Sequence, residues 1–281
     1  MPSLTLRSFA SGSSGNCTYI ASDTTRLLID AGISTGRIRA HLREMGTDLE
    51  GLHGICITHE HIDHVQALPV LQRQHPVPLF ANAGTVQSIA RSAKFQDLRW
   101  NIFTTGNAFD IGDFRIEPYS IPHDAFDPVG YLVHWGPVKI GMATDIGLPT
   151  ALIRTRLKGC HAMVLETNHD EQMLQNADRP WSLKQRILGR QGHLSNDNAA
   201  RMLVEIAGPQ LQRVYLAHLS DDCNRPELAR GTILRALREA NLGHIEVELT
   251  HPNQASAPWR IEVPDDAFLQ ATHTLPSPIL P

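Results

Sequence analysis

Apolar and polar residues alternate at a spacing of two in three short segments near the start of the chain. These segments are residues 4–9, 18–21 and 26–30, and such alternation is typical of β-strands. The turn between the first two, residues 11–16, is rich in serine and glycine and therefore offers many backbone donors. Residues 34–45 are predicted to form a helix. The start of the chain therefore indicates strands that lead into α/β units.

Helical and strand patterns alternate along most of the remaining chain, with short links between them. We expect helices at 65–74, 84–93, 149–158, 170–176, 181–189, 196–206 and 226–240, and strands at 54–58, 78–81, 102–104, 114–121, 130–134, 138–143, 161–166, 213–217 and 244–249. No linker divides the pattern, so we predict one α/β domain over residues 1–263. Residues 264–281 contain four prolines and little periodicity, and we expect a loosely ordered tail there.

Composition narrows the function classes without selecting one. The chain has 281 residues, of which 42% are hydrophobic, and this is enough for a sizeable core. A net charge of −4 gives no global basic field that would indicate nucleic acid. Bound divalent ions would nevertheless make a site locally positive, so a phosphate substrate is not excluded.

Localisation is predicted from what the sequence lacks. There is no basic segment followed by a long apolar core at the N-terminus, and no run approaches 18 apolar residues. The four cysteines, Cys17, Cys56, Cys160 and Cys223, are far apart and form no CxxC pair. They indicate reduced thiols in a cytoplasmic protein rather than a disulfide framework.

The segment Thr58–Val65 concentrates the candidate chemistry. It carries His59, His61, Asp63 and His64 directly after the predicted strand 54–58. If extended geometry persists, His59 and His61 point to one face, because side chains alternate along a strand. Asp63 and His64 open a helical pattern and are aimed elsewhere. One strand-to-helix corner therefore offers imidazole and carboxylate ligands to two adjacent metal ions, whereas the plainer interpretation is a histidine-rich surface turn.

Further candidate ligands stand where other predicted strands end. His123 follows strand 114–121, Asp145 follows strand 138–143, and His218 follows strand 213–217. Taken alone, His123 and Asp145 are each more often ordinary loop residues, but together with His218 they supply ligands that the central segment lacks. Asp30 ends an earlier strand, where it either caps the next helix or orients a ligating imidazole.

This ordered set resembles the metal-site motifs of the metallo-β-lactamase superfamily. The resemblance runs through Leu27–Gly32, His59-x-His61-x-Asp63-His64, His123, Asp145 and His218. It implies a four-layered αβ/βα sandwich of two mixed β-sheets, with the metals at the edge of the sheets. It also implies one metal held by His59, His61 and His123, a second held by Asp63, His64 and His218, and a bridge between them made by Asp145.

Within the superfamily, the chain is most similar to the YycJ/WalJ-like group of cytosolic metal-dependent nucleases, some of which are linked to 5′-to-3′ degradation of duplex DNA. The matching segments are Ser11–Cys17, Thr58–Val65, His123–Tyr131, Glu166–Asp170, Gly192–Asn196 and Leu216–Ser220. Zinc β-lactamases commonly have cysteine in a metal-binding position where this chain offers Asp145. Flavodiiron redox proteins have glutamate where this chain has His61, so a redox role is disfavoured.

The tRNA 3′-processing enzymes of the superfamily also resemble this chain at Glu166 and His193. Some of those enzymes hold tRNA with a long exosite insertion, which this chain lacks. A tRNA substrate is therefore disfavoured, although a ribonuclease of this type remains an alternative.

The expected chemistry is hydrolysis of a phosphodiester by hydroxide that two bridged divalent ions generate near neutral pH. Zn suits the imidazole-rich side, and Mn, or alternatively Fe, accepts the carboxylate-rich side. Asp63 is expected to orient the nucleophile and receive its proton. His193 is the candidate that protonates the leaving oxygen, and Glu166 is expected to fix its tautomer. The alternative role of His193 is that of a helix-entry residue bonded to a backbone carbonyl.

Substrate contacts are predicted in two places. The hydroxyls and amides of the turn, with Ser13, Ser14 and Asn16, are expected to face a substrate phosphate, or else simply to join two strands. His169 is predicted to contact substrate or to support the site. The segment after Asp178 is predicted to bind nucleic acid through Arg179, Trp181, Lys184, Arg186 and Arg190. A solvated helix face with a core tryptophan explains the same segment.

We therefore predict a dinuclear-metal-dependent phosphodiesterase, with DNA more strongly indicated than RNA and exonuclease action favoured. One alternative is a small-molecule hydrolase on the same scaffold, such as a cyclic phosphodiesterase or a thioester hydrolase. A second is a metal-bearing but inactive nucleic-acid-binding module, which the complete ligand set disfavours.

Overall fold

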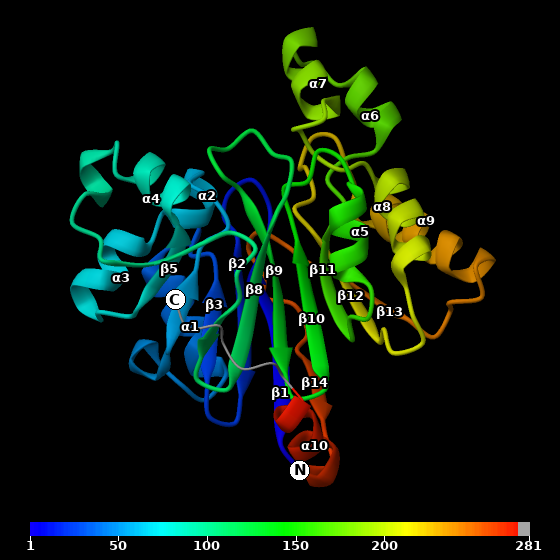
Figure 1. Cartoon of the computed structure of the whole chain (residues 1–281). Coiled ribbons are helices and arrows are strands. Elements are labelled where there is room, and N and C mark those ends of the chain that lie inside the picture. The colour runs from blue at the N-terminus through cyan, green and yellow to red at the C-terminus, as the bar shows by residue number, and fades with distance from the viewer. Residues whose placement is uncertain (275–281) are drawn as a thin grey trace.

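Two seven-stranded mixed sheets lie face to face in the computed structural model, which describes residues 1–274 and the side chains of residues 1–271 (Figure 1). The first sheet has the order β14-β1-β2-β3-β4-β5-β6 and the second β13-β12-β11-β10-β9-β8-β7. The strands of the first sheet are β1 (Ser3–Ala10), β2 (Cys17–Ser22), β3 (Arg26–Ile29), β4 (Gly54–Cys56), β5 (Leu79–Asn82), β6 (Trp100–Phe103) and β14 (Trp259–Glu262). Those of the second are β7 (Phe109–Ile111), β8 (Phe114–Ser120), β9 (Val129–Trp135), β10 (Val138–Ala143), β11 (Ala162–Glu166), β12 (Arg213–Ala217) and β13 (Glu246–Leu249).

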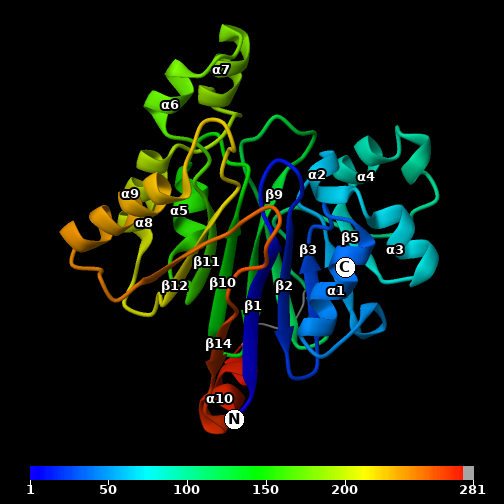
Figure 2. The same cartoon turned by 180° about the vertical axis from the view of Figure 1, so that it is seen from behind.

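Helices cover the outer faces of both sheets (Figures 1 and 2). On the first sheet lie α1 (Thr35–Glu44), α2 (Ile62–Val65), α3 (Leu68–Gln74) and α4 (Ala83–Ile89). On the second lie α5 (Ala151–Leu157), α8 (Asn196–Ile206) and α9 (Pro226–Glu239). This arrangement confirms the predicted four-layered αβ/βα sandwich.

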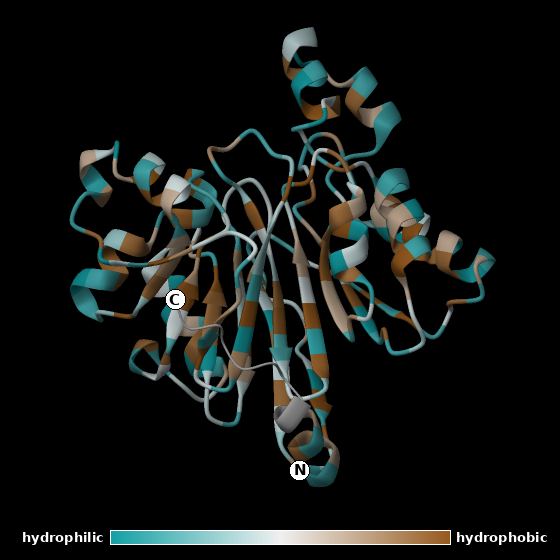
Figure 3. Cartoon of the chain, viewed as in Figure 1, coloured by the Kyte–Doolittle hydropathy of each residue, from teal (hydrophilic) through white to brown (hydrophobic). Residues whose placement is uncertain are grey.

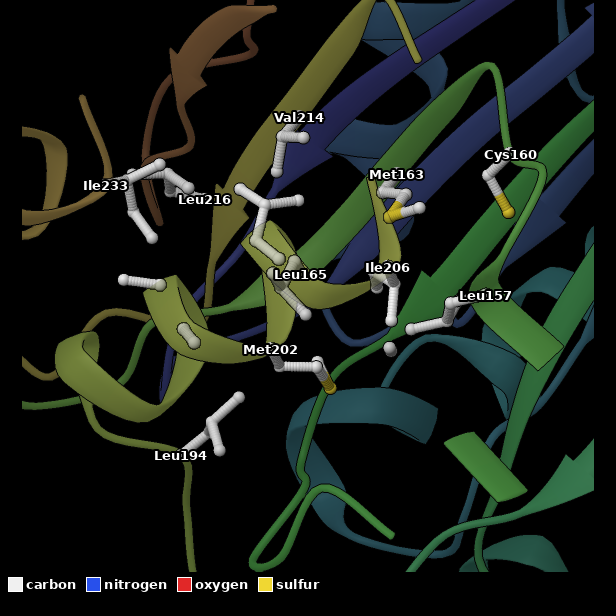
Figure 4. Close-up of a cluster of buried hydrophobic side chains, with 14 of the residues drawn as sticks. Leu157, Cys160, Met163, Leu165, Leu194, Met202, Ile206, Val214, Leu216 and Ile233 are labelled. Carbon is white, nitrogen blue, oxygen red and sulfur yellow. The ribbon is translucent and has the colours of Figure 1, made fainter. Parts of the chain in front are cut away.

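Each pair of neighbouring layers encloses its own apolar cluster. Between the sheets, the cluster includes Leu6, Phe114, Tyr131 and Trp135. The outer helices carry both hydrophilic and hydrophobic residues, as expected for helices with one face on a sheet and the other in solvent (Figure 3). Figure 4 shows how side chains of α5, α8 and α9 converge on those of β11 and β12. The sheets are thus held from both sides, and their strand ends are fixed relative to one another.

The carboxyl ends of several strands meet at one edge of the sandwich. In the first sheet, β3, β4, β5 and β6 run parallel. In the second, β10, β11, β12 and β13 run parallel, and β8 has the same direction because β9 is antiparallel to both β8 and β10. The residues that follow β3, β4, β8, β10, β11 and β12 are therefore delivered to the same end of the molecule.

Some elements differ from those predicted. The expected helix 65–74 is two short helices, α2 and α3, and Pro69 stands in the first turn of α3. Strand β7 was not predicted, because it has three residues and pairs only through the turn at Gly112. Strand β14 was not predicted either, because it exists only through antiparallel pairing with β1 at the other end of the chain.

The expected tail, residues 264–281, lies partly outside the described residues. Within the described part, residues Asp265–Thr274 form helix α10. The ring of Phe268 packs on that of Trp135, with 4.6 Å between centroids. This contact joins α10 to the cluster between the sheets.

A pair of short helices projects beyond the strand ends (Figure 1). It consists of α6 (Glu171–Asn176) and α7 (Trp181–Leu188), and we call residues 171–188 the arm. A small apolar cluster of Leu174, Ile187 and Cys223, with Ala177 and Leu183 beside it, packs at the base of the arm. Among the described residues, no helix is long and apolar enough to span a membrane.

Candidate dinuclear metal centre

The backbone turns sharply where it delivers three of the site residues. Asp30, Asp145 and His218 have φ angles of 63°, 57° and 56°, in the left-handed region that residues other than glycine rarely adopt. Each directly follows a buried strand or is separated from one by a single residue. Such conformations persist when the surroundings enforce them, and they are concentrated at functional sites. The strained backbone at these three positions directs the side chains of Asp30, Asp145 and His218 toward the site.

Three imidazoles converge at the end of β4. Ligand atoms of His59, His61 and His123 lie within 4.8 Å of one another. The rings meet edge to face, with centroids of His59 at 4.5 Å from His61 and 5.0 Å from His123. Burial and the neighbouring histidines lower the pKa of His59 well below its ordinary value. The neutral imidazole that results is the form that binds a metal ion.

A second group lies beside the first. Ligand atoms of Asp63, His64 and His218 also lie within 4.8 Å of one another. Oδ2 of Asp63 is 3.5 Å from Nε2 of His64 and 3.6 Å from Nε2 of His218. Asn16 donates through Nδ2 to Asp63 at 3.2 Å and fixes this carboxylate from the serine-rich turn.

Asp145 stands between the two groups. Its Oδ2 is 3.3 Å from Nε2 of His64, and its Oδ1 is 3.8 Å from Nε2 of His123. Oδ1 also lies 3.4 Å from Nδ1 of His218, so the carboxylate of Asp145 is within reach of both groups. The structure thus brings together all seven side chains predicted as ligands.

The donor set fits divalent cations better than it fits a hydrogen-bonded core. Nε2 of His59, Nε2 of His218 and Oδ2 of Asp145 are buried and have no hydrogen-bond partner. Leaving such atoms buried and unpaired costs about 1–3 kcal/mol each. His59 and Asp145 share one candidate ligand group and His218 belongs to a neighbouring one, so cations bound in these groups would satisfy all three atoms. Imidazole and carboxylate donors suit Zn and Mn.

Asp30 supports the centre from behind. Its carboxylate accepts hydrogen bonds from the amide of Thr58 at 2.8 Å and from Oγ1 of Thr58 at 2.9 Å. It also lies 2.8 Å from Nδ1 of His64, so Nδ1 carries the proton and Nε2 is left for a metal. Burial lowers the pKa of His64, but Asp30 and Asp145 more than offset this and raise it well above its ordinary value, so a cation that binds Nε2 has to displace a proton.

His193 and Glu166 form a pair at the rim of the centre. Nδ1 of His193 is 2.7 Å from Oε1 of Glu166, which is fully buried. Burial raises the pKa of Glu166, but the charge and hydrogen bond of His193 outweigh it and hold that pKa below its ordinary value. The other oxygen of Glu166 accepts the amide of Ile146 at 2.6 Å, which locks the carboxylate in place.

The same pair also admits a different interpretation. Donor atoms of Asp145, Glu166, His193 and His218 lie within 4.8 Å of one another and form a further possible ligand group. Because Glu166 already receives hydrogen bonds from His193 and Ile146, we favour His193 as a residue that acts on substrate. Metal content in a His193 variant separates the two roles.

The residues of the turn that was predicted to face a phosphate, residues 11–16, lie in different surroundings. Ser11 accepts the amide of His218 at 2.8 Å through Oγ, and Asn16 contacts the ligands Asp63 and His64. Ser13 is exposed and lines a cavity of about 370 Å³ beside the centre. Ser14 is exposed but does not line that cavity. The turn therefore contacts the predicted ligands and places one hydroxyl, that of Ser13, at the cavity.

His169 lies behind the site rather than at its surface. It is 1% exposed, does not line the cavity, and has no hydrogen-bond partner at either ring nitrogen. Its backbone carbonyl accepts the amide of Asn196 at 2.9 Å. Direct substrate contact by His169 is therefore disfavoured, and a supporting role is favoured.

The predicted basic residues of the arm are partly engaged by the protein itself. Arg179 is paired with Asp222, and Arg186 is paired with Asp124; both arginines line the cavity. Nζ of Lys184 donates to the carbonyl of Gln175 at 2.7 Å. Arg190 is exposed. Trp181 is 63% exposed, so the alternative that it is a core residue is wrong.

Sequence reasoning missed several residues at the site. Asp124 approaches Nε2 of His123 to 3.3 Å, and Asn168 donates to the carbonyl of His218 at 2.7 Å. Ser220 and Asp222 line the cavity. Asp124 stands beside a predicted ligand, and Asn168 and Ser220 lie in segments already singled out, so proximity along the chain was the available signal for these three; Asp222 lies two residues beyond such a segment.

The chain is similar to known proteins both in sequence and in fold. Residues 25–219 match the family model of the beta-lactamase superfamily domain. An exodeoxyribonuclease YycJ from Bacillus anthracis is 35% identical over 260 residues, which cover 90% of this chain and 96% of the relative. An exodeoxyribonuclease WalJ from Streptococcus pneumoniae is 36% identical over 237 residues, which cover 83% of this chain and 88% of the relative. The solved metallo-beta-lactamase fold protein YhfI from Bacillus subtilis shares the fold, with a TM-score of 0.70, 13% identity, and coverage of 93% of this chain and 100% of YhfI.

Proposed function

The chain belongs to the metallo-β-lactamase superfamily, and from that premise we propose that it is a metal-dependent DNA exonuclease. The single observation that carries the proposal is the convergence of seven imidazole and carboxylate side chains around buried, unpartnered donor atoms. DNA as the substrate is supported by two relatives that are exodeoxyribonucleases and that match most of this chain.

We assign the two ligand groups to two divalent ions. His59, His61 and His123 would hold one ion, Asp63, His64 and His218 the other, and Asp145 both. When bound, such ions supply Lewis acidity to a phosphodiester and activate water for attack. Zn or Mn fits the mixed donor set, and Fe is an alternative.

Asp63 has the position to orient a water molecule. Burial raises the pKa of Asp63, but the neighbouring imidazoles of His218 and His64 outweigh it and hold that pKa well below its ordinary value. Asp63 therefore remains a carboxylate that accepts hydrogen bonds. The side chain is 18% exposed, so it is reachable from the substrate side.

His193 is the proposed proton donor to the leaving oxygen. Burial lowers the pKa of His193, but Glu166 more than offsets this and raises it above its ordinary value. The bond between Nδ1 and Glu166 orients the ring and leaves Nε2 for the substrate. Its place in the wall of the cavity supports this role.

The cavity beside the centre is the proposed place for the neighbouring phosphate. It combines the hydroxyls of Ser13 and Ser220 with the guanidiniums of Arg179 and Arg186. Both guanidiniums are paired with carboxylates, and a DNA phosphate would compete for them. Trp181 and Arg190 on or next to the arm extend the contact surface. A cytoplasmic location is supported by four cysteines that are all free and buried.

The test is digestion of end-labelled DNA by metal-stripped protein to which Mn or Zn is returned. Single-stranded DNA, duplex DNA and RNA are compared with bis(p-nitrophenyl) phosphate and a thioester. We expect DNA to be shortened from its ends, only after a metal is returned. Hydrolysis of the thioester or of the small phosphodiester alone, with intact DNA and RNA, would contradict the proposal.

A further inference from the structure

An exposed aromatic ring stands on the loop that follows the candidate ligand His123. Phe126 is 52% exposed, although the loop that carries it is tied down on several sides. We propose that Phe126, backed by Arg91, is a platform on which an unpaired nucleobase at the end of the DNA stacks. This inference rests on the proposed function and specifies the kind of DNA end that the site accepts.

The backbone of Phe126 is tied to the ligand segment. Its amide donates to Oε1 of Glu60 at 2.8 Å. Glu60 lies in sequence between His59 and His61, and Phe126 lies three residues after His123. The ring is therefore anchored, through one carboxylate and one short loop, to the residues of the imidazole group. A nucleobase on this ring would belong to a nucleotide close to the scissile phosphate.

The loop is also fixed against α4 on its other side. The carbonyl of Asp127 accepts Nδ2 of Asn82 at 2.8 Å and Oγ1 of Thr85 at 3.4 Å. Gly84 permits this contact, because a Cβ there would lie 2.7 Å from Cβ of Asp127 and 3.0 Å from Cδ1 of Phe126. Such contacts hold the loop in one conformation, so a base that stacks on Phe126 does not have to order it.

Arg91 gives the ring a cationic neighbour. Cζ of Arg91 lies 5.4 Å from the centroid of the Phe126 ring, which is cation–π distance. A single exposed aromatic side chain is common on protein surfaces and by itself indicates nothing. An exposed ring held in place, paired with a guanidinium and carried on a loop that begins at a candidate metal ligand is instead a combination suited to binding an unpaired base and its phosphate.

The consequence is a preference among DNA ends. A base in a Watson–Crick pair is stacked within the duplex, and its face is not free for Phe126. The enzyme should therefore bind frayed, mismatched or single-stranded ends better than matched blunt ends. Because every base has an aromatic face, the preference should depend on the presence of a base and only weakly on which base it is.

The experiment compares DNA whose terminal nucleotide is matched, mismatched or abasic, at the end from which wild-type protein degrades DNA. We expect wild-type protein to have its lowest KM for the mismatched end. Removing the base should raise that KM roughly 5- to 150-fold, the range of one base–aromatic stack. An equal KM for mismatched and abasic ends in wild-type protein would overturn the inference.

Substitutions of Phe126 assign the effect to this ring. In Phe126→Ala and Phe126→Leu, the KM difference between mismatched and abasic ends should disappear, since leucine keeps apolar bulk but has no aromatic face. Phe126→Trp should keep the difference. Arg91→Ala should reduce it in part, and bound metal is measured in every variant to show that the centre is intact. A Phe126→Leu variant that keeps the full wild-type difference would assign base recognition elsewhere.

The outcomes separate this inference from the proposed function. If wild-type protein with its metal degrades no DNA, both fail. If it degrades DNA with the same KM for mismatched and abasic ends, only the stacking platform fails. The wild-type comparison decides even where an alanine variant does not fold.

Discussion

The metal centre and the arm lie next to each other but are built in opposite ways. In the centre, His59, His64 and Asp145 are at most 2% exposed, and Asp30 and Asn16 hold their neighbours by hydrogen bonds. The arm is attached through a small apolar cluster and through ion pairs that reach across to other segments. The side chains of the first region are held by burial and hydrogen bonds, whereas the exposed ion pairs of the second can be exchanged for contacts with a substrate.

This contrast assigns different tasks to the two regions. Ions that activate water need donors fixed to within a fraction of an ångström, and buried strand ends provide such precision. A polymer that must be released and rebound is better held by exposed, exchangeable contacts. Substitutions in the centre should therefore abolish hydrolysis, while substitutions in the arm should change affinity.

Asp145→Ala should have the largest effect. Because Asp145 faces both ligand groups, we expect hydrolysis to fall by at least about 10³-fold, more than the usual loss of one transition-state hydrogen bond, and bound metal to decrease. Elemental analysis and a DNA digestion assay measure the two effects. Asp145→Asn is the control for backbone strain, since asparagine tolerates the positive φ at this position. Full activity of the alanine variant would refute the bridging role.

His193→Ala should slow turnover while leaving the metal in place. Loss of a general acid typically costs 10²- to 10⁴-fold. Glu166 would remain held by the amide of Ile146, so the centre should keep its geometry. The measurement is kcat together with metal content. A variant that loses its metal would show that His193 is a ligand.

Asp30→Asn should weaken metal binding, although Asp30 is not itself one of the proposed ligands. A neutral amide at this position holds the proton of His64 at Nδ1 less strongly than the carboxylate does. Nε2 of His64 is then a weaker base and its ring is less firmly oriented. We expect metal affinity to fall by about 10- to 100-fold. Asparagine accepts the left-handed φ of Asp30, so the effect should not arise from the backbone. Competition with a metal-binding dye measures the affinity; an unchanged value would remove Asp30 from the site.

Arg190→Gln should have the smallest effect. Arg190 is exposed next to the arm, so we expect KM for DNA to rise a few-fold and the salt dependence of binding to weaken by about one ionic contact. Turnover at saturating DNA should not change. Arg230→Gln on α9 makes the same charge change away from the centre and serves as the control. Equal effects of the two substitutions would exclude a specific contact near the arm.

The sequence predicted the centre much better than the arm, and the reason is physical. His218 follows the apolar strand β12, which lies parallel to β11, and His123 follows the alternating strand β8, which the antiparallel strand β9 holds in the same direction as β10. Strands that run in the same direction bring their carboxyl ends to one edge whatever the loops do. The partners of the arm could not be predicted in this way. Arg186 pairs with Asp124 and Arg179 with Asp222, and these contacts depend on how two loops fold back over the sheet ends.

In the fold, too, elements with a local sequence pattern could be predicted and elements that depend on distant contacts could not. Strands with local apolar patterns were predicted within a few residues, whereas β14 forms only because β1 lies beside it. The exposure of Trp181 could not be predicted either, because an apolar residue in a short amphipathic segment is as consistent with burial as with contact with substrate.

The most direct test of the central claim is the metal stoichiometry of purified protein, stripped of metal and then equilibrated with Zn or Mn. Seven converging ligands predict saturable uptake of two ions per chain, and Asp145→Ala should lower that number. Protein that takes up no ion, or whose uptake is the same after Asp145→Ala, would contradict the account.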